Sequence, residues 1–269
     1  MNQWPKPARL RELSATNISG RRIAPHRAIH RLEFPAQRWL SVLLLPAVFD
    51  LLVWAGRGPL AEVWASMFQM WLPLLELGGE VTRSSADGGW LGLALPWLAL
   101  PSRVPSTLEW WSIAAVTGIA LIGSRWLDEA WLPARYLVVF VAVIQVSALA
   151  FFATIPAAFP YSVPDYLNSQ LVGGLWMMLV LPWVHGLIYY VFGFALWQKA
   201  ALTTLSLAFL AAAVPFQALS HALLLVEFSL LLLPVLYLVF GILPLMLGCV
   251  GLYGWAMSWR RSDDEAGSD

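Results

Sequence analysis

A few polar side chains inside long apolar stretches are the residues of this sequence that could do chemistry. Asp50, Thr117, Gln145 and His185 each lie about 13–18 Å along an apolar stretch, at 1.5 Å of helical rise per residue. Tyr189 follows His185 by one helical turn and shares its face. Polar groups at such depth in a membrane are costly and mark proton, ion or substrate sites. These five residues form a candidate midplane site, and the alternative is that they only fix helix packing through interhelical hydrogen bonds.

A second pair of polar residues lies toward the far end of another apolar stretch. His221 is about 33 Å from Lys199 along a helix, and Glu227 follows His221 within two turns. This outer-face pair has the chemistry to bind a cation or a polar lipid headgroup, and the alternative is a solvated helix end. Because His185 and His221 differ in depth, the sequence does not support a haem held between them.

Specific catalytic and cofactor motifs are absent from the sequence. It contains no Gly-x-x-x-x-Gly-Lys phosphate loop, no His-Glu-x-x-His zinc helix, no Gly-x-Gly-x-x-Gly fingerprint and no Gly-x-Ser-x-Gly nucleophile elbow. The single cysteine, Cys249, lies in an apolar stretch and forms no metal-binding pair. We therefore expect no metal and no cofactor, and we leave the catalytic residues, if there are any, unassigned.

The elements that must position these residues follow from the composition. Of the 269 residues 59% are hydrophobic and 12% are charged, whereas soluble domains carry about 25% charged residues. This excludes a disordered chain, a nucleic-acid-binding domain and a disulfide scaffold. A spanning helix needs about 20 apolar residues, and six stretches qualify: Trp39–Gly56, Glu109–Trp126, Arg135–Phe159, Gln170–Trp197, Ala200–Val226 and Phe228–Trp259. The sequence thus predicts an all-α integral membrane protein with six transmembrane helices.

Four prolines lie inside the later predicted spans, namely Pro182, Pro215, Pro234 and Pro244. Each removes a backbone hydrogen bond, so they predict kinks, which neighbouring helices can accommodate in a membrane.

The segment Pro59–Gly78 has the length of a span but carries a polar stripe. Its polar residues recur at steps of three and four, and its opposite face is apolar. This pattern predicts an amphipathic helix at the outer membrane surface or against a partner helix. Its apolar face includes Val63, Trp64, Met67 and Trp71. Pro73 should bend or end this helix.

A small β-hairpin is predicted after the amphipathic helix. Asp87-Gly88-Gly89 has the residues that a tight turn requires. Leucines alternate with other residues along Trp90–Trp97, which is typical of a half-buried strand, and Glu80–Ser85 is its predicted partner.

The placement of basic residues predicts the orientation. With six spans, thirteen Lys and Arg residues lie on the cytoplasmic side and three lie outside. If Pro59–Gly78 also spans, ten lie on the cytoplasmic side and six lie outside. We therefore expect both termini to be cytoplasmic, in a bacterial inner membrane. The predicted parts are a basic tail at 1–38, a first transmembrane helix at 39–56, an outer-face helix and hairpin at 57–108, a five-helix bundle at 109–259 and a second tail at 260–269.

Three function classes fit these features. A non-catalytic accessory or assembly subunit of a cell-envelope complex is favoured, because the spans hold few charges and the interfacial helix offers a docking surface. A transporter or permease subunit would use the midplane polar site, although the sequence shows no internal repeat. A membrane-embedded enzyme acting on a lipid-linked substrate is the least favoured class. The expected partners are membrane lipids and a membrane protein, with no nucleic acid.

Overall fold

The computed structural model describes residues 36–83, 95–191 and 194–259. In this part of the chain six helices are long and apolar enough to cross a membrane, as expected for a multi-pass membrane protein. The chain divides into two units, Met1–Ser41 and Val42–Asp269. The first unit contributes only the first turns of one helix to the described residues, and all contacts below belong to the second. Apart from residues 36–38, the predicted tails lie outside the described residues.

The first helix, α2 (Ala36–Leu74), is continuous where the sequence predicts two helices. The predicted boundary between a span at Trp39–Gly56 and an amphipathic helix at Pro59–Gly78 is therefore wrong. Pro46 and Pro59 both lie inside α2, because a proline removes one amide donor and bends a helix without having to end it. At 33 residues, Val42–Leu74 has a rise of about 50 Å, so it tilts within a hydrocarbon core of about 30 Å or extends beyond it.

The end of α2 lies where Pro73 predicts it. The Leu77 amide donates to the Leu72 carbonyl at 3.0 Å, and Glu76 adopts a left-handed φ of 54°. This is the arrangement of a helix C-terminus in which one left-handed residue lets the following amides satisfy the last carbonyls.

The predicted two-stranded sheet is present, but its second strand starts later. Strands β1 (Glu80–Arg83) and β2 (Pro96–Ala99) pair antiparallel, with Glu80 opposite Ala99 and Arg83 opposite Pro96. Pro96 takes the first position of β2, where its missing N–H costs least. Within the described residues the second strand therefore covers only Pro96 and Trp97 of the predicted Trp90–Trp97, and residues 90–94 and the predicted turn at Asp87-Gly88-Gly89 lie outside the described residues.

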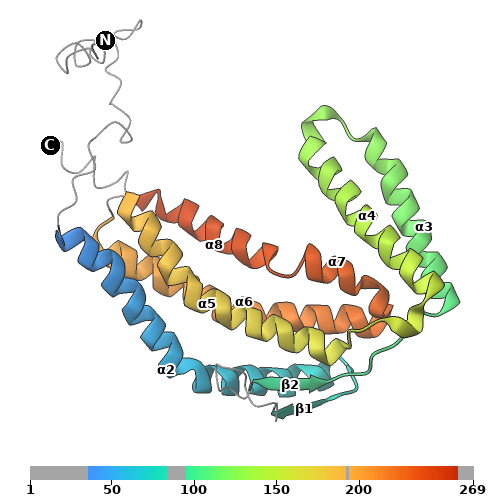
Figure 1. Ribbon diagram of the computed structural model, residues 1–269, viewed down its shortest axis with the longest axis horizontal. Helices are drawn as coiled ribbons and strands as arrows, with labels where there is room; N and C mark the ends of the chain where they lie inside the picture. The colour runs from blue at the N-terminus through green and yellow to red at the C-terminus, as the bar shows by residue number, and fades with distance from the viewer. Residues whose placement is uncertain (1–35, 84–94, 192–193, 260–269) are drawn as a thin grey trace, which may run out of the picture. The chain divides into compact units, whose positions relative to one another are not determined.

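Helices α3 (Thr107–Gly123) and α4 (Leu132–Thr154) form a hairpin (Figure 1). Two short 3₁₀ turns, η3 (Ser124–Trp126) and η4 (Glu129–Trp131), connect them. The Trp110 indole N–H donates to the Leu149 carbonyl at 3.0 Å and ties one helix to the other. The predicted span Arg135–Phe159 ends earlier than expected, because α4 stops at Thr154 before a 3₁₀ turn, η5 (Pro156–Ala158).

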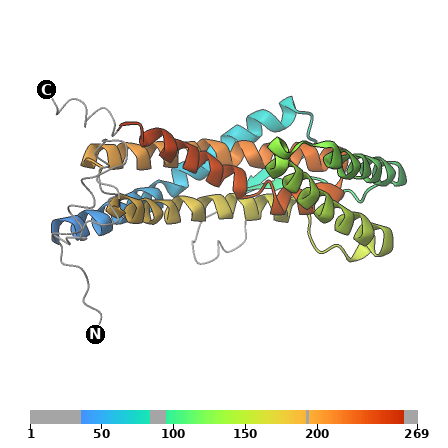
Figure 2. The same cartoon turned by 90° about the horizontal axis from the view of Figure 1, so that it is seen from above.

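The long helices α5 (Val163–Val191) and α6 (Leu196–Phe228) run side by side and form the centre of the bundle (Figures 1 and 2). They pack closely where α5 has no side chain: a Cβ at Gly174 would lie 2.5 Å from Val214 Cγ1. Pro182 and Pro215 lie inside α5 and α6, as predicted.

The last predicted span, Phe228–Trp259, is broken rather than kinked. It consists of η6 (Leu230–Leu232), α7 (Leu233–Leu238) and α8 (Leu243–Ala256). Pro234 and Pro244 occupy the first turns of α7 and α8, where the amide that a proline lacks would have no helical partner in any case. The two prolines thus begin new helices, and the residues between Leu238 and Leu243 leave the helix.

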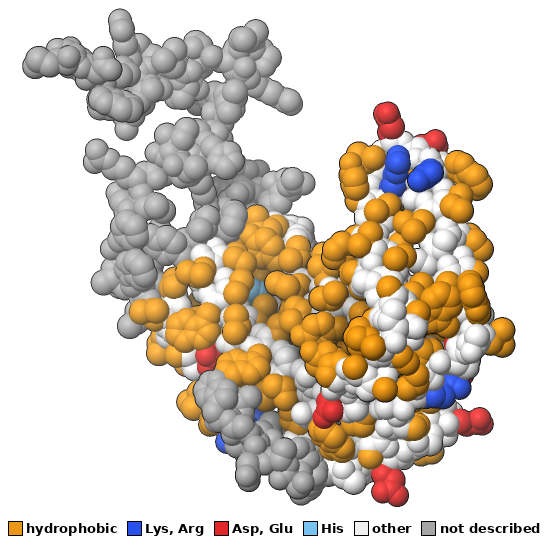
Figure 3. Space-filling model, turned by 45° about the vertical axis from the view of Figure 1, so that its right-hand side comes forward, with side chains coloured by type: hydrophobic (Ala, Val, Ile, Leu, Met, Phe, Trp, Pro, Cys, Tyr) orange, Lys and Arg blue, Asp and Glu red, His pale blue; other side chains and the backbone are white. Residues whose placement is uncertain are grey.

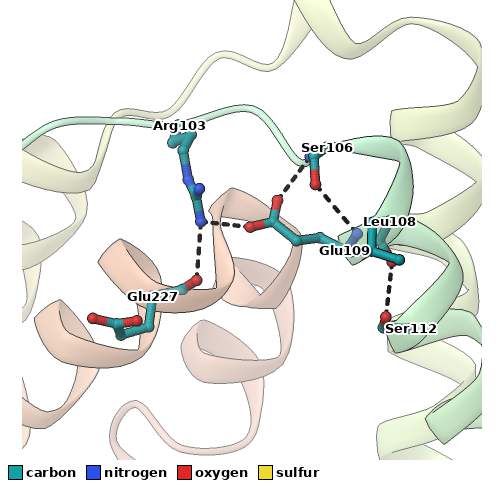
Figure 4. Close-up of polar contacts among 6 residues, drawn as sticks. All are labelled: Arg103, Ser106, Leu108, Glu109, Ser112 and Glu227. Atoms are coloured by element: carbon teal, nitrogen blue, oxygen red, sulfur yellow. Dashed lines mark hydrogen bonds and ion pairs between the residues drawn. The ribbon is translucent and has the colours of Figure 1, made fainter.

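An extended segment, Leu100–Ser106, connects the starts of α3 and α5 to the end of α6. The Arg103 guanidinium donates to the Glu109 carboxylate at 2.5 Å and to the main-chain carbonyl of Glu227 at 3.0 Å (Figure 4). Glu109 also completes a capping box with Ser106 at the first turn of α3. The main chain of Arg103 accepts from the Leu230 amide at 3.1 Å, so one arginine joins three elements.

The turn between α6 and η6 holds a strained serine. Ser229 has φ 69° and ψ 176°, a region that glycine alone adopts readily. Its side chain is buried, and its hydroxyl has no hydrogen-bond partner among the described residues.

We predict that Ser229→Gly raises the free energy of unfolding by about 1 kcal/mol, because relief of 1–3 kcal/mol of strain exceeds the added entropy of the unfolded chain. Ser229→Ala should raise the free energy of unfolding by less, since it removes the buried hydroxyl and leaves the backbone strained. Denaturant unfolding of the two variants in the same detergent measures the difference. A glycine variant no more stable than the alanine variant would contradict the strain.

Candidate functional site

Two of the five predicted midplane residues bond to main-chain carbonyls at separate places. The Thr117 hydroxyl donates to the Ile113 carbonyl of its own helix at 2.7 Å. The Gln145 amide N–H donates to the Leu231 carbonyl at 3.2 Å and joins α4 to η6. Both side chains are buried. The Gln145 contact joins two elements, as an interhelical hydrogen bond would, whereas the Thr117 contact stays within its own helix.

Asp50 contacts α5 at a third place. The Trp183 indole N–H donates to Asp50 Oδ2 at 2.5 Å, while Oδ1 is buried without a partner among the described residues. Pro46 and Val42, on the same helix, approach Gly186 so closely that a Cβ there would lie 3.0 Å from the Val42 carbonyl. Asp50 thus marks the contact of α2 with α5, and no contact found within the described ranges joins it to Gln145 or Thr117.

His185 and Tyr189 do come together, with a residue that sequence reasoning missed. The Tyr189 hydroxyl donates to the Lys199 carbonyl at 2.9 Å and lies 2.9 Å from Thr203 Oγ1. His185 Nδ1 lies 3.3 Å from Thr203 Oγ1 and 3.4 Å from the Tyr189 hydroxyl. All three side chains are buried. This cluster links α5 to the first turns of α6, and Thr203 could not be identified without knowing that these helices pair.

The outer-face pair is separated. The Tyr166 hydroxyl lies 2.7 Å from His221 Nδ1, and Gln170 Nε2 lies 2.9 Å from the same nitrogen. The Tyr166 and His221 rings stack at a centroid distance of 6.0 Å. Glu227 is exposed, and its main-chain carbonyl accepts a hydrogen bond from Arg103, while its carboxylate points away from Arg103 (Figure 4). Among the described residues no contact joins His221 to the Glu227 carboxylate, and a role of the pair in binding a cation or headgroup stays a prediction.

The apolar face predicted for Pro59–Gly78 packs on α6 at two of its four named residues. Trp64 is buried and its indole N–H donates to the Ala211 carbonyl at 2.8 Å. Trp71 packs edge-on against Phe216 at a centroid distance of 6.4 Å. Met67 is half-buried, whereas Val63 is 63% exposed. The buried face is centred on Trp64, Phe68 and Leu72, and their four-residue spacing was the missed signal for Phe68.

A hollow of about 350 Å³ lies where the last span is broken, between α5, α6 and the α7–α8 junction. Most of its lining is apolar, including Met177, Val214 and Leu245. Its polar lining includes Gln170, whose Oε1 is buried without a partner among the described residues. Sequence reasoning missed this place, because Gln170 lies near a predicted helix end and the break itself was not expected.

The Gln217 side chain on α6 is hydrogen-bonded to the main chain at the break of the last span, beside this hollow. Its side-chain N–H group donates to the main-chain carbonyls of Phe240 and Gly241. A Cβ at Gly241 would lie 2.5 Å from the Tyr237 carbonyl, so the chain can turn here only at a glycine. Carbonyls freed by a helix break in a membrane need such donors, because no water replaces them.

The hollow has the chemistry of a binding site for an apolar or amphiphilic molecule. Ligand sites are mostly apolar concavities of about 300–1,000 Å³ with a few polar groups. Among the described residues no group of three or more His, Cys, Asp or Glu side chains could hold a metal ion.

Comparison with protein-family models, curated proteins and solved structures finds no match for this chain.

We predict that Gln217→Leu lowers the free energy of unfolding by about 1–3 kcal/mol, because two carbonyls lose their donor in an apolar setting. The matched control is Gln69→Leu, the same change at an exposed position on α2. Denaturant unfolding in mixed micelles measures both variants. Equal stabilities of the two variants would contradict a structural role for Gln217.

Proposed function

We propose that this multi-pass membrane protein binds a small apolar or amphiphilic molecule in the hollow beside the broken span. The observation that carries the proposal is the hollow itself, about 350 Å³ within the helical bundle, with Gln170, whose buried Oε1 has no partner among the described residues, as one of its lining residues. A buried amide oxygen without a donor costs about 1–3 kcal/mol, which a ligand hydroxyl or N–H group would recover. The ligand thus combines a hydrogen-bond donor with an apolar body.

The broken span favours a transporter or permease subunit over the other classes for this site. Discontinuous transmembrane helices form the substrate sites of many transporters, because their free carbonyls and amides face a cavity. Here Gly241 lies both at the break and in the lining of the hollow. Proton or ion coupling through Asp50 and His185 is not part of this proposal, since neither residue lines the hollow.

Gly173 allows the hollow to be filled without disturbing the bundle. It lines the hollow, and a Cβ there would meet nothing within 4 Å. We predict that Gly173→Phe removes most of the labelling of α5 and α8 by a diazirine-bearing dodecanol in phosphatidylcholine nanodiscs, because the ring occupies the ligand volume. Mass spectrometry of the photolabelled peptides gives the measurement.

The matched control is Gly118→Phe on α3, where a Cβ also meets nothing within 4 Å and which lies outside the hollow. It should leave the labelling of α5 and α8 unchanged. Labelling that survives Gly173→Phe, or that both variants reduce alike, would mean that the alcohol reaches these helices from the surrounding lipid.

The orientation that goes with this proposal has both termini in the cytoplasm of a bacterial cell. The excess of Lys and Arg at the ends of the chain supports it. Arg57, on the outward side, lies 3.7 Å above the Trp54 ring and donates to the Trp54 carbonyl. A tryptophan beside an arginine is typical of the membrane–water interface. This pair therefore supports a position of the outer membrane surface near Arg57, in the middle of the continuous helix α2.

An accessory or assembly subunit of a cell-envelope complex is the second candidate, supported by an exposed apolar ridge on α2. Val63, Met70 and Leu74 are 63%, 61% and 67% exposed and recur along one side of the helix. The neighbouring Ser66 and Gln69 are exposed as well. An apolar ridge beside polar residues fits the apolar face of a partner's helix at the outer membrane surface.

We expect a partner in fixed stoichiometry to copurify with the tagged chain and to be lost from Val63→Glu, because the new carboxylate would be desolvated in the interface. Ser66→Glu adds the same charge to the polar side, one turn away, and should keep the partner. Native mass spectrometry of the solubilised complex measures both. A chain that is alone and homogeneous without either substitution would rule this function out.

A further inference from the structure

The connection between α3 and α4 brings two arginines to one hollow. A depression of about 300 Å³ opens at this end of the hairpin. Its lining consists of Leu121, Ile122, Ser124, Arg125, Arg135 and Val139. Arg125 comes from η3 and Arg135 from the first turns of α4, so the hairpin closure places two residues ten positions apart on one surface. In Figure 3 basic side chains lie side by side near the tip of the hairpin.

Neither guanidinium has a protein partner within the described residues. The one ion pair found in that part of the chain joins Arg103 to Glu109. Asp128 and Glu129 lie in the same connection and are exposed, yet neither approaches Arg125 or Arg135 closely enough for an ion pair. Arg135 is half-buried and Arg125 exposed. Two like charges on one hollow repel each other, and an anion between them would relieve the repulsion.

The surroundings indicate what kind of anion this is. Trp126 and Trp131 flank the connection and are 82% and 62% exposed, as expected of residues at the membrane–water interface. The apolar part of the hollow, Leu121, Ile122 and Val139, continues onto the apolar surface of the hairpin. A free anion would use only the arginines, whereas a lipid would use both parts of the hollow.

We propose that Arg125 and Arg135 bind the phosphate group of an anionic membrane lipid, whose acyl chain lies against α3 and α4. Paired guanidiniums bind phosphate with parallel N–H···O bonds, and basic pockets between transmembrane helices bind lipid headgroups. The site is separate from the hollow beside the broken span and does not depend on the function proposed above.

The test is native mass spectrometry of the full chain with phosphatidylglycerol or phosphatidylcholine of the same acyl chains. Bound phosphatidylglycerol should exceed bound phosphatidylcholine. The variant Arg125→Gln/Arg135→Gln should weaken phosphatidylglycerol binding about 25-fold, about fivefold for each charge. Because the two side chains have no protein partners in the described part, this variant should unfold at the temperature of the unsubstituted chain.

Two comparisons keep the proposal falsifiable. Arg57→Gln removes a charge at another membrane boundary and should leave lipid binding unchanged. A conservative Arg125→Lys/Arg135→Lys variant keeps the charges but loses the paired geometry. Its affinity for phosphatidylglycerol should lie between those of the unsubstituted chain and the double glutamine variant. Equal losses in the Arg57 and the double glutamine variants, or no preference for phosphatidylglycerol, would overturn the site. Displacement of the lipid by millimolar inorganic phosphate would overturn the lipid as the source of the phosphate.

Discussion

Every main-chain carbonyl freed inside an apolar bundle must find a donor, and this constraint governs how the helices of the chain meet. Polar side chains donate to main-chain carbonyls of a neighbouring helix or turn, both where a span breaks and inside a continuous helix such as α4. They are Trp64, Trp110, Gln145, Tyr189 and Gln217. An unsatisfied carbonyl costs about 1–3 kcal/mol, and a transmembrane interior offers no water to take its place. Many of the few polar side chains in the spans thus help to determine which helices pack together.

This use explains why six spans could be predicted while the candidate midplane site could not. Length and hydropathy are local properties, so each apolar stretch identifies a helix without reference to the others. Depth is local too, and Thr117 and Gln145 were grouped by depth. Thr117 bonds to Ile113 within its own helix, whereas the partner of Gln145, Leu231, depends on which helices are adjacent and on where a helix breaks. His185 and Tyr189 do contact each other, because a spacing of four residues along a helix is itself local.

Prolines illustrate the same limit within one chain. Pro59 and Pro182 lie inside continuous helices, whereas Pro234 and Pro244 begin new ones. The sequence around a proline shows only that one amide donor is missing, which is equally true of all four. Whether the helix continues depends on what else satisfies the freed carbonyls, and at the last span Gln217 of α6 does so. The sequence around a proline therefore does not by itself show whether a helix continues through it or ends.

The hollow beside the break would be costly if it were closed and empty. A closed, empty cavity costs about 24 cal/mol for each Å³, so 350 Å³ would cost on the order of 8 kcal/mol if nothing entered it. That is comparable to the whole stability of an ordinary domain, about 5–15 kcal/mol. The long α5–α6 pair shows that this chain can pack closely, with Val214 against Gly174. The volume next to Gly173 is open because the break turns the chain away, and a molecule from the membrane that fills it would restore the lost contacts.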